Sequence, residues 1–192
     1  LNSKSTLLYP QEFTGDSRSV FLLGEANFKV KPDKKRPFIV KSNDLQITAL
    51  GTEFNVSAYP ESQEIATTLI SGSIRVAYNN LTTSVILHPN EQFAYNRNNK
   101  KYDLSNPDMD DVTAWQRGEL VLQKMTLTDI INVLERKYPY AFVYSIKNLK
   151  NDRFSFRFKD NAPLEEVMEI IVNVVGQMDY RIVEDKCYLT RI

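Results

Sequence analysis

The fold of the N-terminal half is decided by residues 45–58, which read LQITALGTEFNVSA. Apolar and polar residues alternate over residues 45–49 and again over residues 54–58, and Gly51 lies between the two runs. An alternation of period two gives a β-strand one buried and one exposed face. The stretch therefore predicts two short β-strands joined by a turn.

Comparable runs flank this stretch on both sides. The further β-rich runs are residues 20–23, 28–30, 38–40, 65–70, 74–78, 85–87 and 93–95. Turn-forming residues separate them at short spacing, and no helical period of useful length precedes residue 110. We therefore predict that residues 1–98 form an all-β domain, built as a twisted sandwich or as a solenoid-like structure.

The hydrophobic period changes after a polar segment. Residues 99–112 are rich in turn formers and acids and are predicted to connect two domains. Beyond them, Leu127, Ile130, Ile131 and Leu134 follow the spacing of one helical face, and residues 164–175 repeat that pattern. Each pattern predicts an amphipathic helix.

Residues at the ends of these patterns support both helices. Thr126 is a suitable N-cap for the first helix, and Pro139 stops it. Pro163 begins the second helix and Gly176 follows its end. With strands predicted on both sides of each helix, residues 113–192 should form a small α/β domain of two β-α-β repeats whose helices cover one sheet.

The composition excludes several classes of function. The chain of 192 residues has 24 basic and 24 acidic residues, and residues 1–110 carry 12 of each. This balance argues against a dedicated nucleic-acid binder and gives no support for docking on an anionic membrane. No stretch approaches the roughly 18 apolar residues of a membrane span.

The rare residues argue against metal and nucleophilic chemistry. His88 is the only histidine and Cys187 the only cysteine, so Cys/His ligands cannot form a zinc site and no internal disulfide is possible. His88 lies in a strand-to-turn sequence and reads as a surface histidine. We predict no cofactor, no metal and no enzymatic activity, although catalysis by carboxylates alone leaves no recognisable spacing.

A strand of alternating phenylalanines is the first candidate binding element. Residues 154–158 read FSFRF, which most simply describes a strand with one face in the core. The alternative is an edge strand that adds a partner strand, in which case Phe154, Arg153 and Arg157 would contact the partner.

Trp115 and the neighbouring Arg117 form the second candidate. Trp115, the only tryptophan, would be an exposed hot spot or, more simply, an anchor packed where the connector enters the second domain. The many Tyr and Phe residues also allow a glycan-binding or structural envelope module, although aromatic residues are favoured in strands in any case.

Five sequence blocks in order resemble those of the FecR family of anti-sigma regulators. They are GEANFKV at 24–30, RPFIV at 36–40, LGTEFNV at 50–56, LISGSI at 69–74 and LHPNEQ at 87–92. Asn90 stands where the family has Gly, a change that a left-handed backbone tolerates. Asn27 stands where an aromatic residue is common. WQRGEL at 115–120 and the segments after it resemble the C-terminal domain that follows FecR modules, which is similar to the short secretin/TonB N-terminal fold.

The resemblance implies a role in signalling across the bacterial envelope. FecR-type regulators are inner-membrane proteins whose periplasmic region binds the N-terminal signalling domain of a TonB-dependent outer-membrane receptor. A cytoplasmic segment holds an extracytoplasmic-function (ECF) sigma factor. The present chain is then expected to be the periplasmic region, anchored through an upstream helix that it does not contain, and to act by binding.

Overall fold

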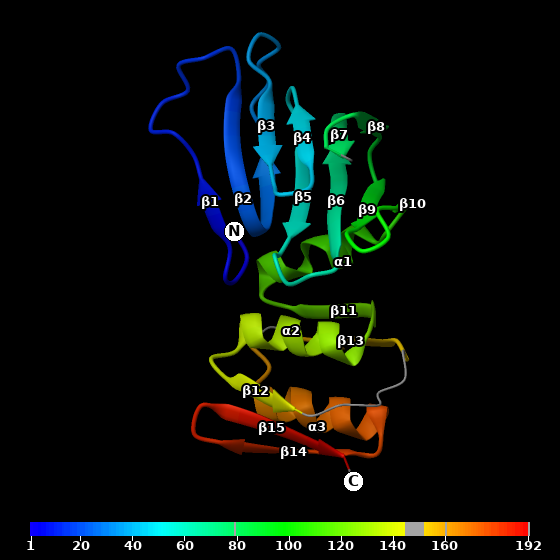
Figure 1. Ribbon diagram of the computed structural model, residues 1–192. Coiled ribbons are helices and arrows are strands. Elements are labelled where there is room, and N and C mark those ends of the chain that lie inside the picture. Colours follow the sequence, from blue (N-terminus) through cyan, green and yellow to red (C-terminus); the bar gives the residue numbers. More distant parts are fainter. Residues whose placement is uncertain (79, 145–151, 160, 192) are drawn as a thin grey trace. The chain divides into compact units, whose positions relative to one another are not determined.

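The computed structural model describes residues 1–78, 80–144, 152–159 and 161–191 (Figure 1). The chain divides into two compact units, Leu1–Thr113 and Ala114–Ile192.

The first unit is built from one large sheet that curls on itself (Figure 1). Its path runs β10-β9-β6-β5-β2-β3-β4-β7-β8, and β1 joins it beside β2. The strands are β1 (Thr6–Leu8), β2 (Arg18–Lys29), β3 (Phe38–Lys41), β4 (Gln46–Ala49), β5 (Glu53–Ala58), β6 (Glu64–Ser71), β7 (Ile74–Tyr78), β8 (Thr83–Leu87), β9 (Gln92–Asn96) and β10 (Tyr102–Ser105). The prediction of an all-β N-terminal half is confirmed, with a curled sheet as its form.

Strand β2 is long enough to serve both halves of the sheet. Residues 18–21 pair with β3 in parallel, whereas residues 24–29 pair with β5 in antiparallel register. The partner changes at Gly24, whose φ of 102° lies in the region that favours glycine. A Cβ there would lie 2.4 Å from the hydroxyl of Ser5, so β1 can approach β2 only because position 24 has no side chain.

The core of the first unit lies between the two halves. Fully buried side chains come from both, including Val40 and Ile47 on one half and Phe54 and Phe93 on the other. Tyr102 of β10 stacks on Phe93 at 4.9 Å and meets Tyr78 of β7 edge-on at 5.2 Å. These rings bring the two end regions of the sheet into contact.

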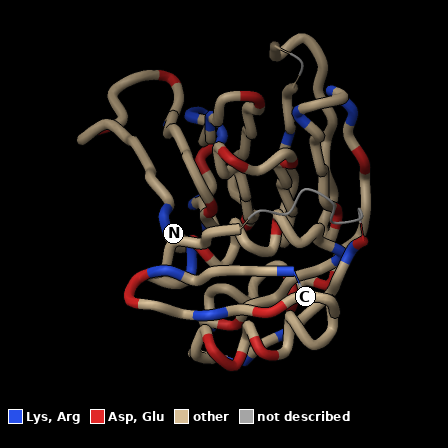
Figure 2. Tube along the Cα trace, turned by 60° about the horizontal axis from the view of Figure 1, so that its bottom comes forward, with Lys and Arg blue, Asp and Glu red and all other residues tan. Residues whose placement is uncertain are grey.

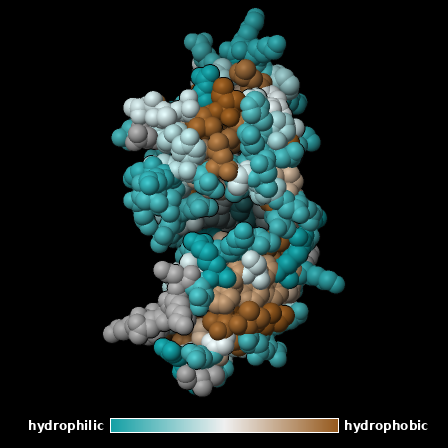
Figure 3. All heavy atoms as spheres, turned by 90° about the vertical axis from the view of Figure 1, so that its right-hand side faces the viewer, coloured by the Kyte–Doolittle hydropathy of each residue, from teal (hydrophilic) through white to brown (hydrophobic). Residues whose placement is uncertain are grey.

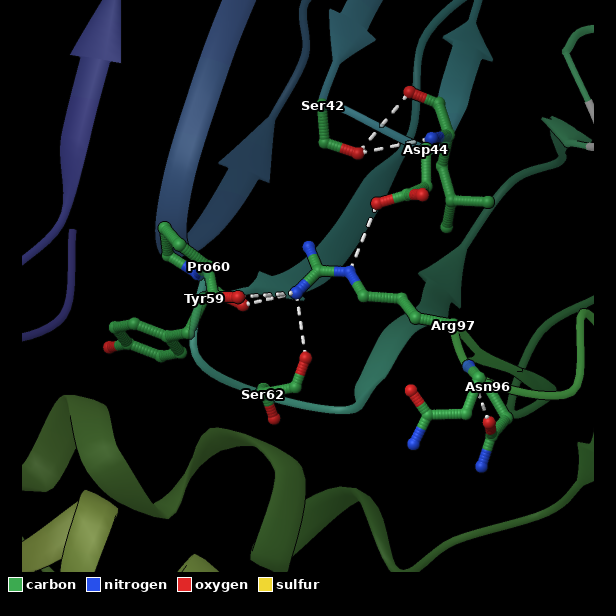
Figure 4. A network of polar contacts seen from close by, with 9 residues as sticks. Ser42, Asp44, Tyr59, Pro60, Ser62, Asn96 and Arg97 are labelled. Carbon is green, nitrogen blue, oxygen red and sulfur yellow. Dashed lines mark hydrogen bonds and ion pairs between the residues drawn. The ribbon is translucent and has the colours of Figure 1, made fainter.

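Arg97, which directly follows β9, bonds two other connections of the first unit (Figure 4). Its Nε donates to Asp44 in the β3–β4 turn at 3.0 Å. Its Nη1 donates to the carbonyls of Tyr59, Pro60 and Ser62 between β5 and β6, at 2.7, 3.0 and 2.7 Å. The side chain is only 16% exposed, so water cannot fully replace these bonds.

The segment predicted as a connector is structured. It contains β10, which pairs with β9, and most of the short helix α1 (Met109–Thr113). Alternation over residues 102–105 is too short to be recognised as a strand, because its side chains are mostly exposed on both faces.

The second unit contains two helices and two small sheets. The 3₁₀ turn η1 (Ala114–Arg117) leads into β11 (Leu120–Met125), α2 (Leu127–Lys137) and β12 (Ala141–Tyr144). After them come β13 (Phe154–Phe158), α3 (Leu164–Val175), β14 (Met178–Val183) and β15 (Lys186–Arg191). One sheet joins β11 to β13, and the other has the order β12-β15-β14.

The prediction of two β-α-β repeats on one sheet is not confirmed. The order of elements along the chain is as expected, but β11 and β12 lie in different sheets, and so do β13 and β14. Antiparallel pairing of β11 with β13, which follow one another only after an intervening helix and strand, produces this division. Local periodicity contains no information about such long-range pairing.

Both predicted helices are present with the expected faces and caps. Leu127, Ile130, Ile131 and Leu134 are buried in α2, and Thr126 caps this helix by accepting a bond from the Asp129 amide. In α3 the buried residues are Leu164, Val167, Met168, Ile171 and Val172, and Gly176 forms the C-cap.

Candidate functional site

The two-stranded sheet β11–β13 has an open edge on each side. Leu120 lies opposite Phe158 and Leu122 opposite Phe156. Among the residues that the structure describes, neither strand has a second neighbour. Unpaired backbone groups along a strand edge are a ready template for a further strand.

The phenylalanines of β13 face the core of the second unit. Phe156 and Phe158 are buried, Phe154 is half-buried, and the rings stack along the strand at 6.3 and 5.9 Å. The simpler interpretation of FSFRF is therefore confirmed for Phe156 and Phe158. These rings belong to the core of the second unit, whereas Ser155 and Arg157 on the opposite face of β13 are exposed.

Arg117 and Arg157 meet on one carboxylate. Glu119 Oε2 accepts from Arg157 Nε at 3.1 Å and from Nη2 at 2.8 Å. Its Oε1 accepts from Arg117 Nε at 2.8 Å. Glu119 therefore binds both guanidinium groups, one through each carboxylate oxygen.

The two arginines lower the pKa of Glu119. The hydrogen bond from Arg117 makes the largest contribution and that from Arg157 the next, because both favour the charged carboxylate. The arginine side chains are 44% and 43% exposed, and that of Glu119 is 22% exposed. Solvent screening keeps such exposed pairs weak, so a partner carboxylate can compete for either arginine.

Trp115 lies in the turn η1, which also contains Arg117 of this cluster. The Gly118 amide bonds the Trp115 carbonyl at 3.0 Å, and the Glu119 amide bonds the Ala114 carbonyl at 3.3 Å. Lys137 of α2 donates to the Gly118 carbonyl. Trp115 is half-buried, so part of the ring packs inside while the remainder meets solvent.

Arg153 lies at the other end of β13 and has a different role. Its Nη1 donates to the Lys124 carbonyl at 2.7 Å, and the Lys124 amide donates to Ser155 Oγ at 2.9 Å. Lys124 has a φ of 50° and lies where the β11–β13 register shifts between Leu122 and Met125. Arg153 therefore stabilises a bulge.

The structure brings three of the five predicted candidate residues together and places the other two apart from them. Arg117 and Arg157 come together on Glu119, and Trp115 shares the turn of Arg117. Arg153 and Phe154 lie at the opposite end of β13. Sequence reasoning missed Glu119, because its contact with Arg157 depends on the pairing of β11 with β13.

Exposed apolar side chains lie elsewhere. Figure 3 shows them in separate groups bordered by hydrophilic residues. In the second unit they belong to α3, β12 and β14, and include Val143, Ile170, Val174 and Val183. The Arg117–Glu119–Arg157 cluster, more than apolar area, thus distinguishes the β11–β13 sheet, since β12 and β14 are edge strands as well.

The most exposed tyrosines come from separate parts of the chain. Tyr9, Tyr102 and Tyr144 lie in three different segments, and Tyr102 already stacks on Phe93. A glycan-binding surface needs aromatic faces side by side. These positions give no support to the alternative of a glycan-binding module.

His88 is a surface residue, as predicted, and Cys187 lies in the interior. His88 is exposed between β8 and β9, and Asn90 beside it has a φ of 69°. Cys187 is buried, and burial raises the pKa of its thiol to about 11. Within the described ranges there is no group of three or more metal-ligating residues, and no helix there is long and apolar enough to cross a membrane.

Comparisons with known proteins agree over both units. The family model for the FecR protein matches residues 1–75, and the model for the FecR C-terminal region matches residues 119–189. No curated protein matches the chain. Two crystal structures of a candidate anti-sigma factor from Parabacteroides distasonis ATCC 8503 are 33% identical, with a TM-score of 0.91. The matches cover 100% of this chain and 89% or 88% of theirs. The chain belongs to the FecR family of regulatory anti-sigma factors.

Proposed function

We propose that this chain is the periplasmic sensor region of a transmembrane anti-sigma factor. It binds the N-terminal signalling domain of a TonB-dependent outer-membrane receptor and relays the signal to an ECF sigma factor. The relay acts through binding and involves no chemistry in these residues. The inner-membrane anchor and the cytoplasmic segment that holds the sigma factor belong to parts of the protein outside these 192 residues.

The observation that supports this function is the open β11–β13 sheet with the Arg117–Glu119–Arg157 cluster at its end. Backbone groups on the edge of β13 supply affinity for an added strand, whatever its sequence. A carboxylate on that strand would take one of the two arginines from Glu119 and thereby fix the register. Trp115, in the turn before β11, would add contact area.

Isothermal titration of the 192-residue chain with the signalling domain of the receptor encoded beside its gene tests the proposal. We expect micromolar or tighter binding, and Arg157→Ala should weaken it about tenfold, the loss of one charge-assisted contact. Arg75→Ala, a change at an exposed arginine of β7, is the matched control and should leave binding unchanged.

Hydrogen exchange on the same complex locates the contact. Amides of residues 154–158 should gain protection when the receptor domain binds, because an added strand covers the β13 edge. Absence of binding at micromolar concentration rules out the receptor as partner. Binding with protection confined to the first unit rules out β13 as the site.

A further inference from the structure

Strand β14 is an open edge of the three-stranded sheet in the second unit. It pairs with β15 along its whole length, and it has no neighbour on its other side among the residues that the structure describes. The Tyr180 amide donates to Asp179 Oδ1 at 2.8 Å, so a side chain takes the place of a strand neighbour at this amide. Because backbone groups alternate between the two sides of a strand, the groups of Met178 and Ile182 share the open side with those of Tyr180.

The side chains of β14 separate into an apolar and a charged set. Met178 is buried, and Tyr180 and Ile182 are half-buried on the side of the core. Asp179 and Arg181 point to the opposite face and are exposed, since side chains two positions apart share a face. Charges of both signs therefore occur along the hairpin of β14 and β15 (Figure 2).

Neither charge of β14 is neutralised within its own chain. Asp179 and Arg181 have no ion-pair partner in the ranges that the structure describes. Arg181 lies over the ring of Tyr188 on β15, 5.7 Å from its centre, and Asp179 bonds only the neighbouring amide. Both groups are therefore available to an added strand.

This pattern is complementary to itself. When two copies of β14 run antiparallel with Tyr180 opposite Tyr180, Asp179 of each copy faces Arg181 of the other, and Met178 faces Ile182. Opposite charges that face each other across antiparallel strands favour pairing. A two-fold axis forms each of these contacts twice, and the open backbone groups of the two strands meet in the same register.

The other open edges in the described part of the chain lack this pattern. β10 has only Asp103 as a charged residue, β11 only Lys124 and β13 only Arg157, and β1, β8 and β12 have none. A strand with charges of one sign cannot form an ion pair with its own copy. Charge complementarity thus identifies a second copy of β14 as the strand that fits this edge.

We propose that β14 is a self-association surface, at which two copies of this chain pair antiparallel about Tyr180 and join their three-stranded sheets into one. The surface belongs to the sheet β12-β15-β14, whereas the receptor contact proposed above belongs to the sheet β11–β13. Asp179 must release the Tyr180 amide before the strands can pair, and one strand from each copy is a small interface. The dissociation constant of the dimer should therefore be on the order of 100 µM.

Sedimentation equilibrium of the whole 192-residue chain, at concentrations up to about 1 mM, tests the proposal. The unaltered chain should dimerise. D179R and R181D each place like charges opposite one another at both positions, so each should weaken dimerisation about tenfold. An equimolar mixture of D179R and R181D restores opposite charges at both positions, and it should dimerise about as well as the unaltered chain. The double variant D179R/R181D should do the same.

Matched reversals separate the strand contact from overall charge. D16R and K4D change exposed residues of the first unit and should leave dimerisation as it is. A chain that stays monomeric up to about 1 mM overturns the proposal. Dimerisation that D179R and R181D leave unchanged, or that their mixture fails to restore, also overturns it.

Hydrogen exchange on the unaltered chain tests the same contact without any substitution. The amides of Tyr180 and Ile182 should gain protection as the protein concentration rises, because a second strand covers them. Concentration-dependent protection that spares β14 contradicts the proposal. Thermal unfolding of each variant establishes that it is folded, and the receptor domain is absent throughout.

Discussion

Arg157 donates two hydrogen bonds to one carboxylate oxygen of Glu119, which lies 38 positions earlier in the chain. The pairing of β13 with β11 brings the two residues together, and Arg117 bonds the other oxygen. The cluster can therefore form only when β11 and β13 are paired.

Replacing Glu119 by Gln should change how stability depends on pH. Arg117 and then Arg157 lower the pKa of Glu119 in the folded protein. Such a carboxyl adds stability that is fully present above its unfolded pKa and is lost as the pH falls through its folded pKa. Urea unfolding should thus show the variant less stable at neutral pH, with the difference shrinking at about pH 3.

The control for this change is Asp16→Asn, which removes one charge at an exposed position without an ion pair in the described residues. A difference between Glu119→Gln and the unaltered chain that stays constant with pH would contradict the role given to the two arginines.

Replacing Arg97 by Met should destabilise the first unit by about 2–4 kcal/mol. The variant leaves Asp44 and three carbonyls without their donor in a mostly buried site. Urea unfolding monitored by tyrosine fluorescence measures the effect. Arg75→Met, at an exposed position of β7, should change stability little. Similar unfolding midpoints for the two variants would contradict a stabilising role of the Arg97 hydrogen bonds.

Replacing Gly24 by Ala should destabilise the first unit by about 1–3 kcal/mol, because position 24 combines a positive φ with a close approach of Ser5. Gly15→Ala is the matched control, since a Cβ at that position meets nothing within 4 Å. Thermal unfolding of the two variants should separate them clearly; equal melting temperatures would show that β2 does not need glycine at its bend.

Removing the N-cap of α2 should weaken the second unit. Thr126→Ala deletes the acceptor of the Asp129 amide and should lower stability by about 1 kcal/mol. Thr128→Ala, two residues later at an exposed position of the same helix, should be neutral or slightly stabilising. Chemical denaturation compares them, and an unchanged Thr126→Ala midpoint would speak against the cap.

The thiol of Cys187 should resist alkylation in the native protein. Burial raises its pKa to about 11, and the folded chain also shields the sulfur. At mildly alkaline pH, iodoacetamide should therefore react at least about a hundredfold more slowly with the folded chain than with the chain in urea. Similar rates in the two states would mean that β15 opens readily.

Sequence patterns predicted the features that depend on residues close together in the chain. The helical faces of α2 and α3, the cap at Thr126 and the left-handed turn at Asn90 follow from local spacing and local conformational preference. Strand partners do not, because the β11–β13 pair joins residues about 30 or more positions apart. The Arg117–Glu119–Arg157 cluster depends on that pair and could not be anticipated.

Because β2 pairs with both halves of the sheet, it affects how the first unit unfolds. Residues 18–21 are bonded to β3 and residues 24–29 to β5, so separating the two halves breaks at least one of these two ladders of β2. β1 adds a third ladder to the same strand. A mechanical load applied at the N-terminus is therefore passed through β1 to the strand that joins the two halves of the sheet.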